Sequence, residues 1–354
     1  MKTMKKIAAI ILCLAVVFAL SACHKKDEIA VTVKSGKNEM EFTSAMYSYA
    51  LLEADMEARN TLESQANDTI TDYYSKQIDG MKYVPWVEKK AMENLKTFAY
   101  YNFKAKELGV ELTAEEIAEA KSYAETYWDY YGYGDTYEQN GVGKSTFATA
   151  NTYYSLSDAL FKKIYGEGGE KEVSKATIEE NMLENFEVVN LIAIDISEYK
   201  EKEVTETKNK LEGYKKRLKK GESFEKIYGE YYDTKPEDHS GHTHDGVQSS
   251  EDHYATVVGS KDTDYAIDIF DDIKKMKEGD ISVFSDENYL YLVVRKDLNK
   301  DKYFFEKLKE DTLWLLKEAD YLDVIAKNIS EYELDENTYA TNLFKVKKIK
   351  YPAN

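Results

Sequence analysis

The pattern of apolar residues changes at one point in this chain, and that change limits the folds open to it. Ahead of residue 187, most apolar positions recur at helical intervals of three and four residues, but the run EVVNLIAIDI from Glu187 is nearly continuous and has the length of a strand. Segments of both kinds then follow in the order β-α-α-β-α-β-β up to residue 298, and residues 302–328 favour a helix again. We therefore expect an α+β protein with a four-stranded domain over 187–298 inserted into a mostly helical lobe.

Capping signals divide the region ahead of this domain into helices. The Thr43-Ser44 pair is placed to cap a long helix that runs to about Lys76. A second helix has Pro85 in its first turn and is ended by Gly109, and the pair Thr113–Glu116 has the spacing of a capping box at the start of a third. These signals predict a lobe built mainly from long helices.

Strand-like segments near both chain ends predict that this lobe is formed by both ends. The sequence IAVTV at residues 29–33 alternates as a strand does, and a turn and a returning segment follow it. The segment NLFKVKKIKY at 342–351 is a candidate strand to pair with it. We expect residues 29–186 and 299–354 to form one lobe around the inserted domain.

The N-terminal segment has the pattern of an export signal. Three lysines precede an apolar run from Ile7 to Leu20, which is short for a membrane span. Leu20-Ser21-Ala22-Cys23 resembles the lipobox that bacterial lipoprotein signal peptidase recognises. We expect a signal peptide over 1–22, a tether over 23–28, and a Cys23 acylated on its thiol and amine. Several acyl chains anchor firmly, at about 0.8 kcal/mol per buried CH₂, so the extracytoplasmic face of the cell membrane is the expected location.

Charge and cysteine content restrict the partners. Removal of the signal takes three of the 48 basic residues and none of the 66 acidic ones, which changes the net charge from −18 to −21. Such a surface argues against nucleic acid as a partner. Cys13 leaves with the signal and Cys23 is the lipidation site, so no disulfide is expected. No cofactor is expected either, and 30 tyrosines with only 3 prolines favour long helices rich in aromatic residues.

The stretch EQNGVGKSTF, residues 138–147, shares the Gly-Lys-Ser ending of a nucleotide-binding P-loop. A P-loop needs another glycine five residues earlier, because backbone N–H groups of the whole loop wrap the phosphates. Glu138 occupies that position and no buried strand precedes the segment. We interpret the stretch as a glycine-rich turn in which Ser145 caps the next helix and Lys144 is a solvated charge.

The order of segments resembles a known family. Residues 187–298 are similar to a parvulin, a small α/β peptidyl-prolyl isomerase, in GESFEKIYGEYYD, IDIFDDIKKMKEGDIS and NYLYLVV. VTVKSGKNEMEFT and FAYYNFKAKELGVELTAEEIAEA resemble the opening strand and helix pair of SurA-type chaperone domains. With the lipobox, nearly all of the mature chain resembles PrsA-type foldase lipoproteins, which help exported chains fold at the outer face of a Gram-positive membrane. The resemblance implies unfolded or newly exported proteins as partners, membrane attachment through the lipid, and a homodimer as a further assembly.

The residues that parvulins use for catalysis are changed in this chain. The resemblance implies a histidine on the first strand, a Cys or Asp after the second helix and a histidine on the last strand. These positions hold Asn190, Asp233, and Leu290 or, with a shift of one residue, Tyr291. Asparagine forms hydrogen bonds but does not titrate near neutral pH as histidine does. We therefore expect a weak or inactive isomerase, with an active isomerase as the alternative.

Two apolar residues of the inserted domain have two interpretations. A parvulin seats the proline ring in an apolar pocket, and the barrier that it lowers is about 18–20 kcal/mol. Phe270 and Met276 are candidates for that pocket, and ordinary core residues are the alternative.

Aromatic residues concentrate in SYAETYWDYYGYGDTY, residues 122–137, where their spacing places several on one helical face. Tyrosine and tryptophan offer a large contact area with a polar tip and little rotamer cost. Trp128, Tyr130 and Tyr131 are therefore candidates for a surface that binds unfolded clients. Packing of the same face inside the helical lobe is the alternative.

A polar loop in the inserted domain gathers four of the five histidines: His239, His242, His244 and His253. Neutral imidazoles are good ligands for zinc, copper or nickel. A surface metal-binding lipoprotein is thus a further function to test, beside the alternative of a solvated insertion.

Overall fold

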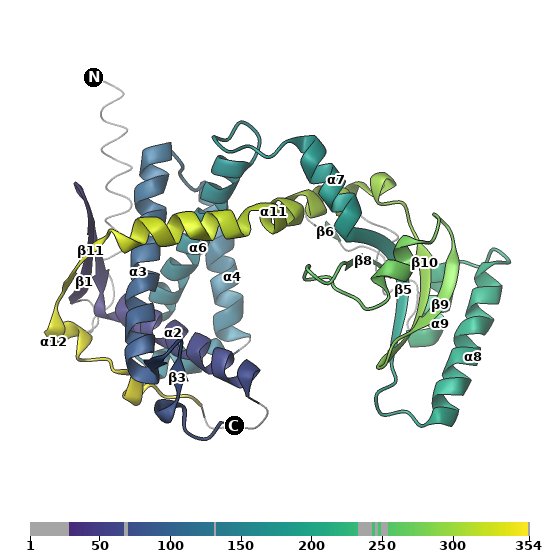
Figure 1. Cartoon of the computed structure of the whole chain (residues 1–354), viewed down its shortest axis with the longest axis horizontal. Coiled ribbons are helices and arrows are strands. Elements are labelled where there is room, and N and C mark those ends of the chain that lie inside the picture. The colour runs from purple at the N-terminus through teal and green to yellow at the C-terminus, as the bar shows by residue number, and fades with distance from the viewer. Residues whose placement is uncertain are drawn as a thin grey trace. The chain divides into compact units, whose positions relative to one another are not determined.

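The computed structural model describes residues 28–66, 70–130, 132–232 and 254–352, together with the backbone of two short strands at 243–244 and 247–248. Its contacts divide the chain into two compact units. The first, which we call the helical lobe, comprises residues up to Ile164 and from Asp320 onward, and the second, the sheet unit, comprises Tyr165–Ala319. Helices and small antiparallel sheets coexist, so the protein is of the α+β class, as predicted (Figure 1).

The helical lobe contains a three-stranded antiparallel sheet that joins the two ends of the described chain. Its strands are β1 (Ile29–Ser35), β2 (Asn38–Thr43) and β11 (Glu333–Glu336), in the order β11-β1-β2. The strand and returning segment predicted near the N-terminus are therefore confirmed, and so is a lobe made from both chain ends.

The predicted position of the C-terminal strand is wrong. Residues 342–351 contain the 3₁₀ turn η4 (Val346–Lys348), and the strand that pairs with β1 is β11. The sequence of β11, ELDE, is fully exposed along an edge, so it lacks the apolar alternation by which a strand is detected.

The remaining elements of the helical lobe are mainly helices. They are α2 (Ser44–Gln65), α3 (Tyr83–Leu108), α4 (Ala114–Asp129), α5 (Tyr133–Gln139), α6 (Lys144–Tyr165), the second part of α11 (Lys302–Ser330) and α12 (Thr338–Thr341). The predicted capping signals are confirmed: Thr43 caps α2, Gly109 ends α3 at φ 64°, and Thr113 and Glu116 form a capping box on α4.

The first long helix is shorter than predicted. It ends at Gln65 instead of near Lys76, and η1 (Tyr73–Ser75) and the hairpin β3 (Gln77–Ile78) to β4 (Met81–Lys82) follow. The hairpin turns at Asp79-Gly80, where both residues have positive φ, at 52° and 75°. An Asp-Gly pair is favoured in such a turn because it tolerates this conformation.

The turn before α6 also differs from its predicted detail. α6 begins at Lys144, so Ser145 lies inside its first turn and does not cap it. Lys144 forms a salt bridge with Asp129, whose carboxylate oxygen is 2.7 Å from Nζ. The short helix α5 precedes the glycine turn, so the strand–loop–helix setting of a P-loop is missing, in agreement with the sequence interpretation.

The sheet unit contains a four-stranded antiparallel sheet. Its order is β8 (Ala255–Gly259), β5 (Phe186–Asp195), β10 (Tyr289–Arg295) and β9 (Ile281–Ser285). The helices of the unit are α7 (Lys175–Asn185), α8 (Glu201–Leu218), α9 (Phe224–Tyr232), α10 (Phe270–Lys274) and the first part of α11; η3 (Leu298–Lys300) and the small hairpin β6 (Thr243–His244) to β7 (Val247–Gln248) complete it. The predicted four-stranded sheet and the order of its elements are confirmed.

Alternation along the strands gives this sheet two apolar faces. On one face, Ile192 and Leu292 pack with α8 and α9 through residues such as Leu211. On the other face, Val189 and Val293 pack with residues of α10. A third cluster joins α7 and α11 to β5 and β8 through Met182, Phe186, Val188, Ala255, Val257, Phe304 and Leu308. This packing explains why the compact unit extends beyond residues 187–298 on both sides.

Candidate functional site

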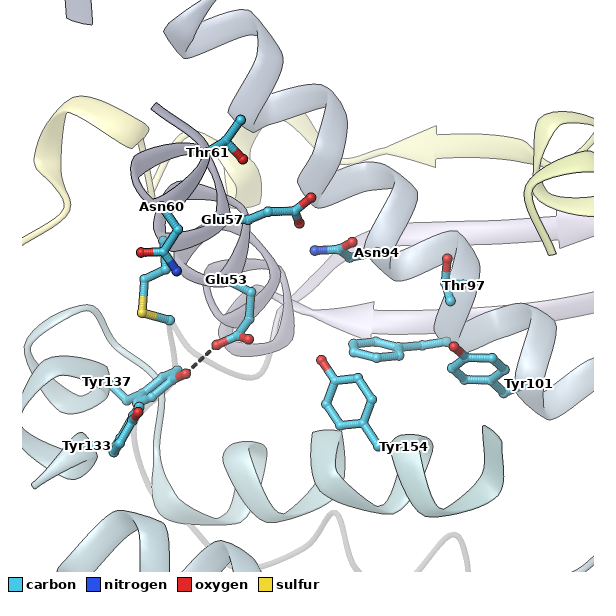
Figure 2. A pocket seen from close by; sticks show the side chains of 12 residues that line it. Glu53, Glu57, Asn60, Thr61, Asn94, Thr97, Tyr101, Tyr133, Tyr137 and Tyr154 are labelled. Atoms are coloured by element: carbon cyan, nitrogen blue, oxygen red, sulfur yellow. Dashed lines mark hydrogen bonds between the residues drawn. The ribbon is translucent and has the colours of Figure 1, made fainter. Parts of the chain in front are cut away.

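Two cavities in the helical lobe share one set of polar and aromatic side chains. Their volumes are about 600 and 640 Å³, within the usual range for binding pockets. Glu53, Tyr133, Tyr137 and Tyr154 line both, so the cavities adjoin. Figure 2 shows the first of them, with Tyr137 and Tyr154 extending toward Glu53. We call the pair the aromatic cavity.

Helical spacing on three elements brings these side chains together. Tyr49 and Glu53 are four residues apart on α2 and therefore share a face. Tyr133 and Tyr137 have the same spacing on α5. Tyr154 comes from α6, seven residues after Phe147, which lines the second cavity.

The rings form a continuous aromatic wall, which we define as Tyr49, Tyr123, Tyr127, Tyr133, Tyr137 and Phe147. Tyr137 is at its centre, with ring centroids 5.7 Å from Tyr49 and 4.8 Å from Phe147. Tyr133 joins Tyr137 at 6.4 Å and Tyr127 at 5.8 Å, and Tyr127 lies 4.4 Å from Tyr123. Ring contacts of this kind stabilise aromatic clusters beyond the area they bury.

Glu53 is the half-buried carboxylate of the cavity. The Tyr137 hydroxyl donates a hydrogen bond to its Oε1 (Figure 2), and this is the only hydrogen bond to Glu53 within the described residues. Burial raises the pKa of Glu53, an effect that the bond from Tyr137 opposes and the nearby Glu57 strengthens. Burial also raises the pKa of Tyr154, to about 12, so this hydroxyl keeps its proton at neutral pH.

The charged residues that line the aromatic cavity all carry carboxylates. Glu53 and Glu57 line the first part, and Glu53, Glu119 and Asp158 line the second. None of the described lining residues is a lysine, arginine or histidine. The cavity therefore offers aromatic surface, hydroxyl donors and negative charge, which suits a guest with apolar parts and positive charge.

Of the three aromatic residues selected from the sequence, Trp128, Tyr130 and Tyr131, the two that the structure describes do not share one surface. Trp128 is 7% exposed and packs its ring 5.5 Å from Phe147, and a Cβ at Gly134 would lie 2.7 Å from its indole nitrogen. Trp128 is thus a core residue. Tyr130 is 81% exposed but does not line the cavity, and Tyr131 lies outside the described residues.

The aromatic-rich stretch 122–137 selected from the sequence does contribute to the cavity, through Tyr123, Tyr127, Tyr133 and Tyr137. The sequence interpretation did not select the residues that complete it. Tyr49, Glu53 and Tyr154 belong to α2 and α6, outside the aromatic-rich stretch. Glu53 is a single carboxylate among many. The four-residue spacing of Tyr49 and Glu53 was the one available signal, and it gains meaning only once α5 and α6 are placed against α2.

In the sheet unit, the predicted catalytic positions that the structure describes are not brought together. Asn190 lies on β5 opposite Val294, whereas Leu290 and Tyr291 lie on β10 opposite Ile194 and Ala193. Leu290 is 1% exposed in the apolar core. Asn190 Oδ1 is buried and accepts no hydrogen bond from the described residues. Among the described residues, Asn190, Leu290 and Tyr291 therefore form no polar cluster with one another.

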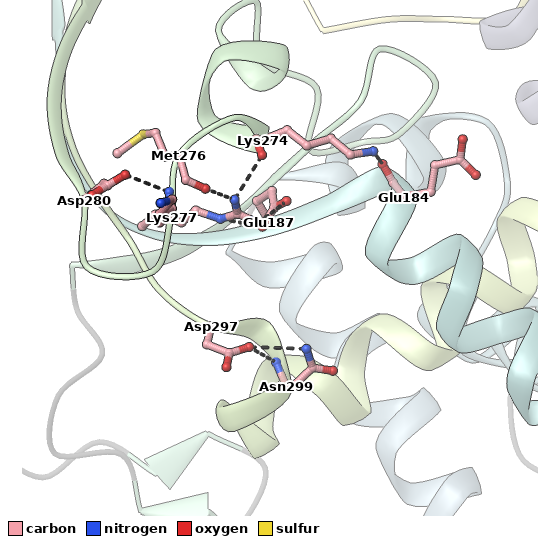
Figure 3. Close-up of polar contacts among 9 residues, drawn as sticks. Glu184, Glu187, Lys274, Met276, Lys277, Asp280, Asp297 and Asn299 are labelled. Atoms are coloured by element: carbon pink, nitrogen blue, oxygen red, sulfur yellow. Dashed lines mark hydrogen bonds and ion pairs between the residues drawn. The ribbon is translucent and has the colours of Figure 1, made fainter.

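Phe270 and Met276 are both buried among Val189, Val293 and other apolar residues, so their surroundings are those of core residues. Beside them, Glu187 and Arg295 form a shielded ion pair, with an oxygen of Glu187 2.6 Å from Nη2 of Arg295. Arg295 also donates to the carbonyl oxygens of Lys274 and Met276, and Figure 3 shows this loop, where Lys274 extends to the carbonyl of Glu184.

Several predicted residues lie outside the described part of the chain. They are Cys23, Asp233, His239, His242, His253 and the side chain of His244. Within the described residues, no group of three or more His, Cys, Asp or Glu side chains is arranged to hold a metal ion. None of the helices in that part of the chain is both long and apolar enough to cross a membrane.

Comparison with known proteins gives likenesses to solved structures. No family model matches the sequence, and no curated protein matches it significantly. The chain is similar to PrsA from Bacillus subtilis, at 18% identity over 69% of this chain and 84% of that one, with a TM-score of 0.33. It is also similar to the foldase protein PrsA from Streptococcus pneumoniae str. Canada MDR_19A, at 15% identity over 68% and 83% with a TM-score of 0.40. A third likeness is to the foldase protein PrsA from Lactococcus lactis, at 14% identity over 89% and 96% with a TM-score of 0.41. All three TM-scores are below 0.5.

Proposed function

We propose that this protein is a lipid-anchored, extracytoplasmic folding factor that holds segments of unfolded exported proteins in the aromatic cavity of its helical lobe. The observation that carries the proposal is the cavity itself, where rings from α2, α4, α5 and α6 surround one half-buried carboxylate. Open aromatic surface with hydroxyl tips can hold many apolar sequences because it makes few geometric demands. The PrsA-type segments of the sequence support the same function.

A refolding assay tests this function. Mature protein should suppress the aggregation of a denatured client that contains no proline and of one whose refolding is limited by proline isomerisation. Help for both clients supports a chaperone, help for the second alone would make the protein an isomerase, and help for neither would overturn the proposal.

Variants of the cavity test where the clients bind. Tyr133 and Tyr154 are 41% and 44% exposed, so replacing both by serine should leave the fold intact. We expect the double variant to lose most aggregation suppression, so that at least five times as much protein is needed for the same suppression. Tyr339→Ser, at a tyrosine 62% exposed and outside the cavity, is the matched control. Equal suppression by both variants would place the clients elsewhere.

For the sheet unit, we propose a parvulin-like fold with little isomerase activity. The support is the aliphatic surroundings of Leu290 and the replacement of a titratable ring by Asn190. In a proline-containing tetrapeptide assay we expect little acceleration over the uncatalysed rate. Acceleration similar to that of an intact parvulin, abolished by Asp233→Ala, would show that the alternative of an active isomerase is correct.

The membrane anchor is part of the same proposal, and it depends on the lipobox sequence that ends at Cys23. Cys23→Ala should prevent labelling by a fatty-acid probe and move the protein from the membrane fraction to the soluble fraction. Retention of the label in the variant would exclude Cys23 as the acylated residue.

A further inference from the structure

The aromatic cavity combines two features that each favour a positive charge. Its walls present tyrosine rings, whose faces carry negative potential and attract ammonium and guanidinium groups. Its charged lining consists of Glu53, Glu57, Glu119 and Asp158, with no basic residue in the described lining. A lysine or arginine inside the cavity would meet attraction on every side, whereas an acidic side chain would meet repulsion.

Glu53 is the point at which this attraction is strongest. Its carboxylate is half-buried, and within the described residues its partner is the neutral hydroxyl of Tyr137 and no cation. Glu57, by contrast, forms a salt bridge with Lys90 at 2.7 Å. A partly desolvated carboxylate without a cationic partner gains more from an incoming positive charge than a solvated one does.

The size and lining of the cavity favour a side chain of a polypeptide over a small free cation. The two parts, about 600 and 640 Å³, are both far larger than one ammonium group. Around the carboxylates they also present Met56, Phe98, Ala120 and Phe147. An extended chain can place a charged side chain at Glu53 and its apolar neighbours on this surface.

We propose that the aromatic cavity recognises a lysine or arginine side chain of an unfolded client, flanked by apolar residues, with the charge beside Glu53 and the neighbouring side chains on the aromatic wall. This inference rests on the proposed function and narrows its clients to cationic, apolar segments. A strongly acidic protein thereby selects segments of opposite charge.

Peptide binding tests the proposal. Three fluorescent ten-residue peptides differ only at a central position, which holds lysine, norleucine or glutamate between apolar residues. Fluorescence anisotropy with the mature protein should give a Kd for the lysine peptide at least tenfold lower than that for the norleucine peptide. The glutamate peptide should show no measurable binding. Equal affinity for lysine and norleucine would overturn the cation preference but leave the chaperone function intact, whereas binding of neither, with no aggregation suppression, would overturn both.

Charge variants test the role of Glu53. Glu53→Gln should reduce the preference for the lysine peptide over the norleucine peptide to about twofold, without weakening the binding of the norleucine peptide. Glu63→Gln, on the same helix α2 but outside the cavity, is the control and should keep the preference. Glu119→Gln, also in the lining, should reduce it to an intermediate value and serves as the test if Glu53→Gln does not fold. An unchanged preference in both lining variants would refute the proposal.

Competition with spermidine distinguishes a cationic side chain of a polypeptide from a small free cation. Excess spermidine should displace the lysine peptide only weakly, because it lacks the apolar neighbours. Displacement by spermidine at the same concentration as by unlabelled peptide would instead identify a site for small free cations.

Discussion

The two units of this protein use their aromatic and polar residues differently. In the helical lobe, tyrosines surround a hollow that contains a half-buried carboxylate, Glu53. In the sheet unit, Leu290, one of the positions where a catalytic group was expected, is part of the apolar core, and the buried carboxylate of Glu187 is paired with Arg295. The difference indicates that the sheet unit pairs its buried carboxylate with a cation of its own, whereas the partner of Glu53 among the described residues is a neutral hydroxyl.

Breaking the buried ion pair should cause the largest effect on stability. Arg295→Ala leaves Glu187, which is 5% exposed, without its cationic partner, and an uncompensated buried charge costs about 3–5 kcal/mol. We expect the free energy of unfolding of the sheet unit, measured with denaturant, to fall by that amount. The variant Glu187→Met with Arg295→Met should be much closer to wild type. Client protection should persist in both, and its loss would contradict the separation of roles between the units.

Removing one hydrogen bond from the helical lobe should have a smaller effect. The hydroxyl of Tyr351 donates to Asp55 at 2.7 Å, and Asp55 is fully buried and also bound by Arg59 and Tyr83. Tyr351→Phe should destabilise the lobe by about 1.5–3 kcal/mol, the usual range for a bond to a charged group. Thermal unfolding monitored by tryptophan fluorescence measures this, with Tyr339→Phe as the control. If only the unfolding of the sheet unit changed, the loss of the Tyr351–Asp55 hydrogen bond could not be the cause.

Changing the cavity carboxylate should have the smallest effect on stability, and of opposite sign. Because burial raises the pKa of Glu53 in the folded state, ionising it costs stability at pH above that pKa, and the cost disappears as the pH falls toward the value of unfolded glutamate. Glu53→Gln should therefore stabilise the free protein by roughly 0.5–1 kcal/mol at neutral pH. This gain in the free energy of unfolding should vanish on acidification. Glu57 and the tyrosines around Glu53 are the same in the variant and in the wild type. A gain that is independent of pH would show that ionisation of Glu53 is not its cause.

The sequence predicted the architecture better than the site. Capping residues such as Thr43, Thr113 and Gly109 act locally, so their roles can be inferred without knowing the rest of the fold. The cavity is different, because it forms only where α2, α3, α4, α5 and α6 meet. β11 was missed for a related reason, since an exposed acidic edge strand is defined by its partner β1 and not by its own pattern.

The pairing of β11 with β1 has a consequence for the order in which the molecule folds as its chain is made. A chain that emerges N-terminus first presents residue 31 long before its partner at residue 336 has arrived. The strands of the sheet unit lie within residues 186–295, so that unit can complete itself earlier. Until Glu336 has emerged, one edge of β1 stays open to pairing with other chains. The proposed folding factor would therefore itself pass through a stage in which an unpaired strand edge is exposed.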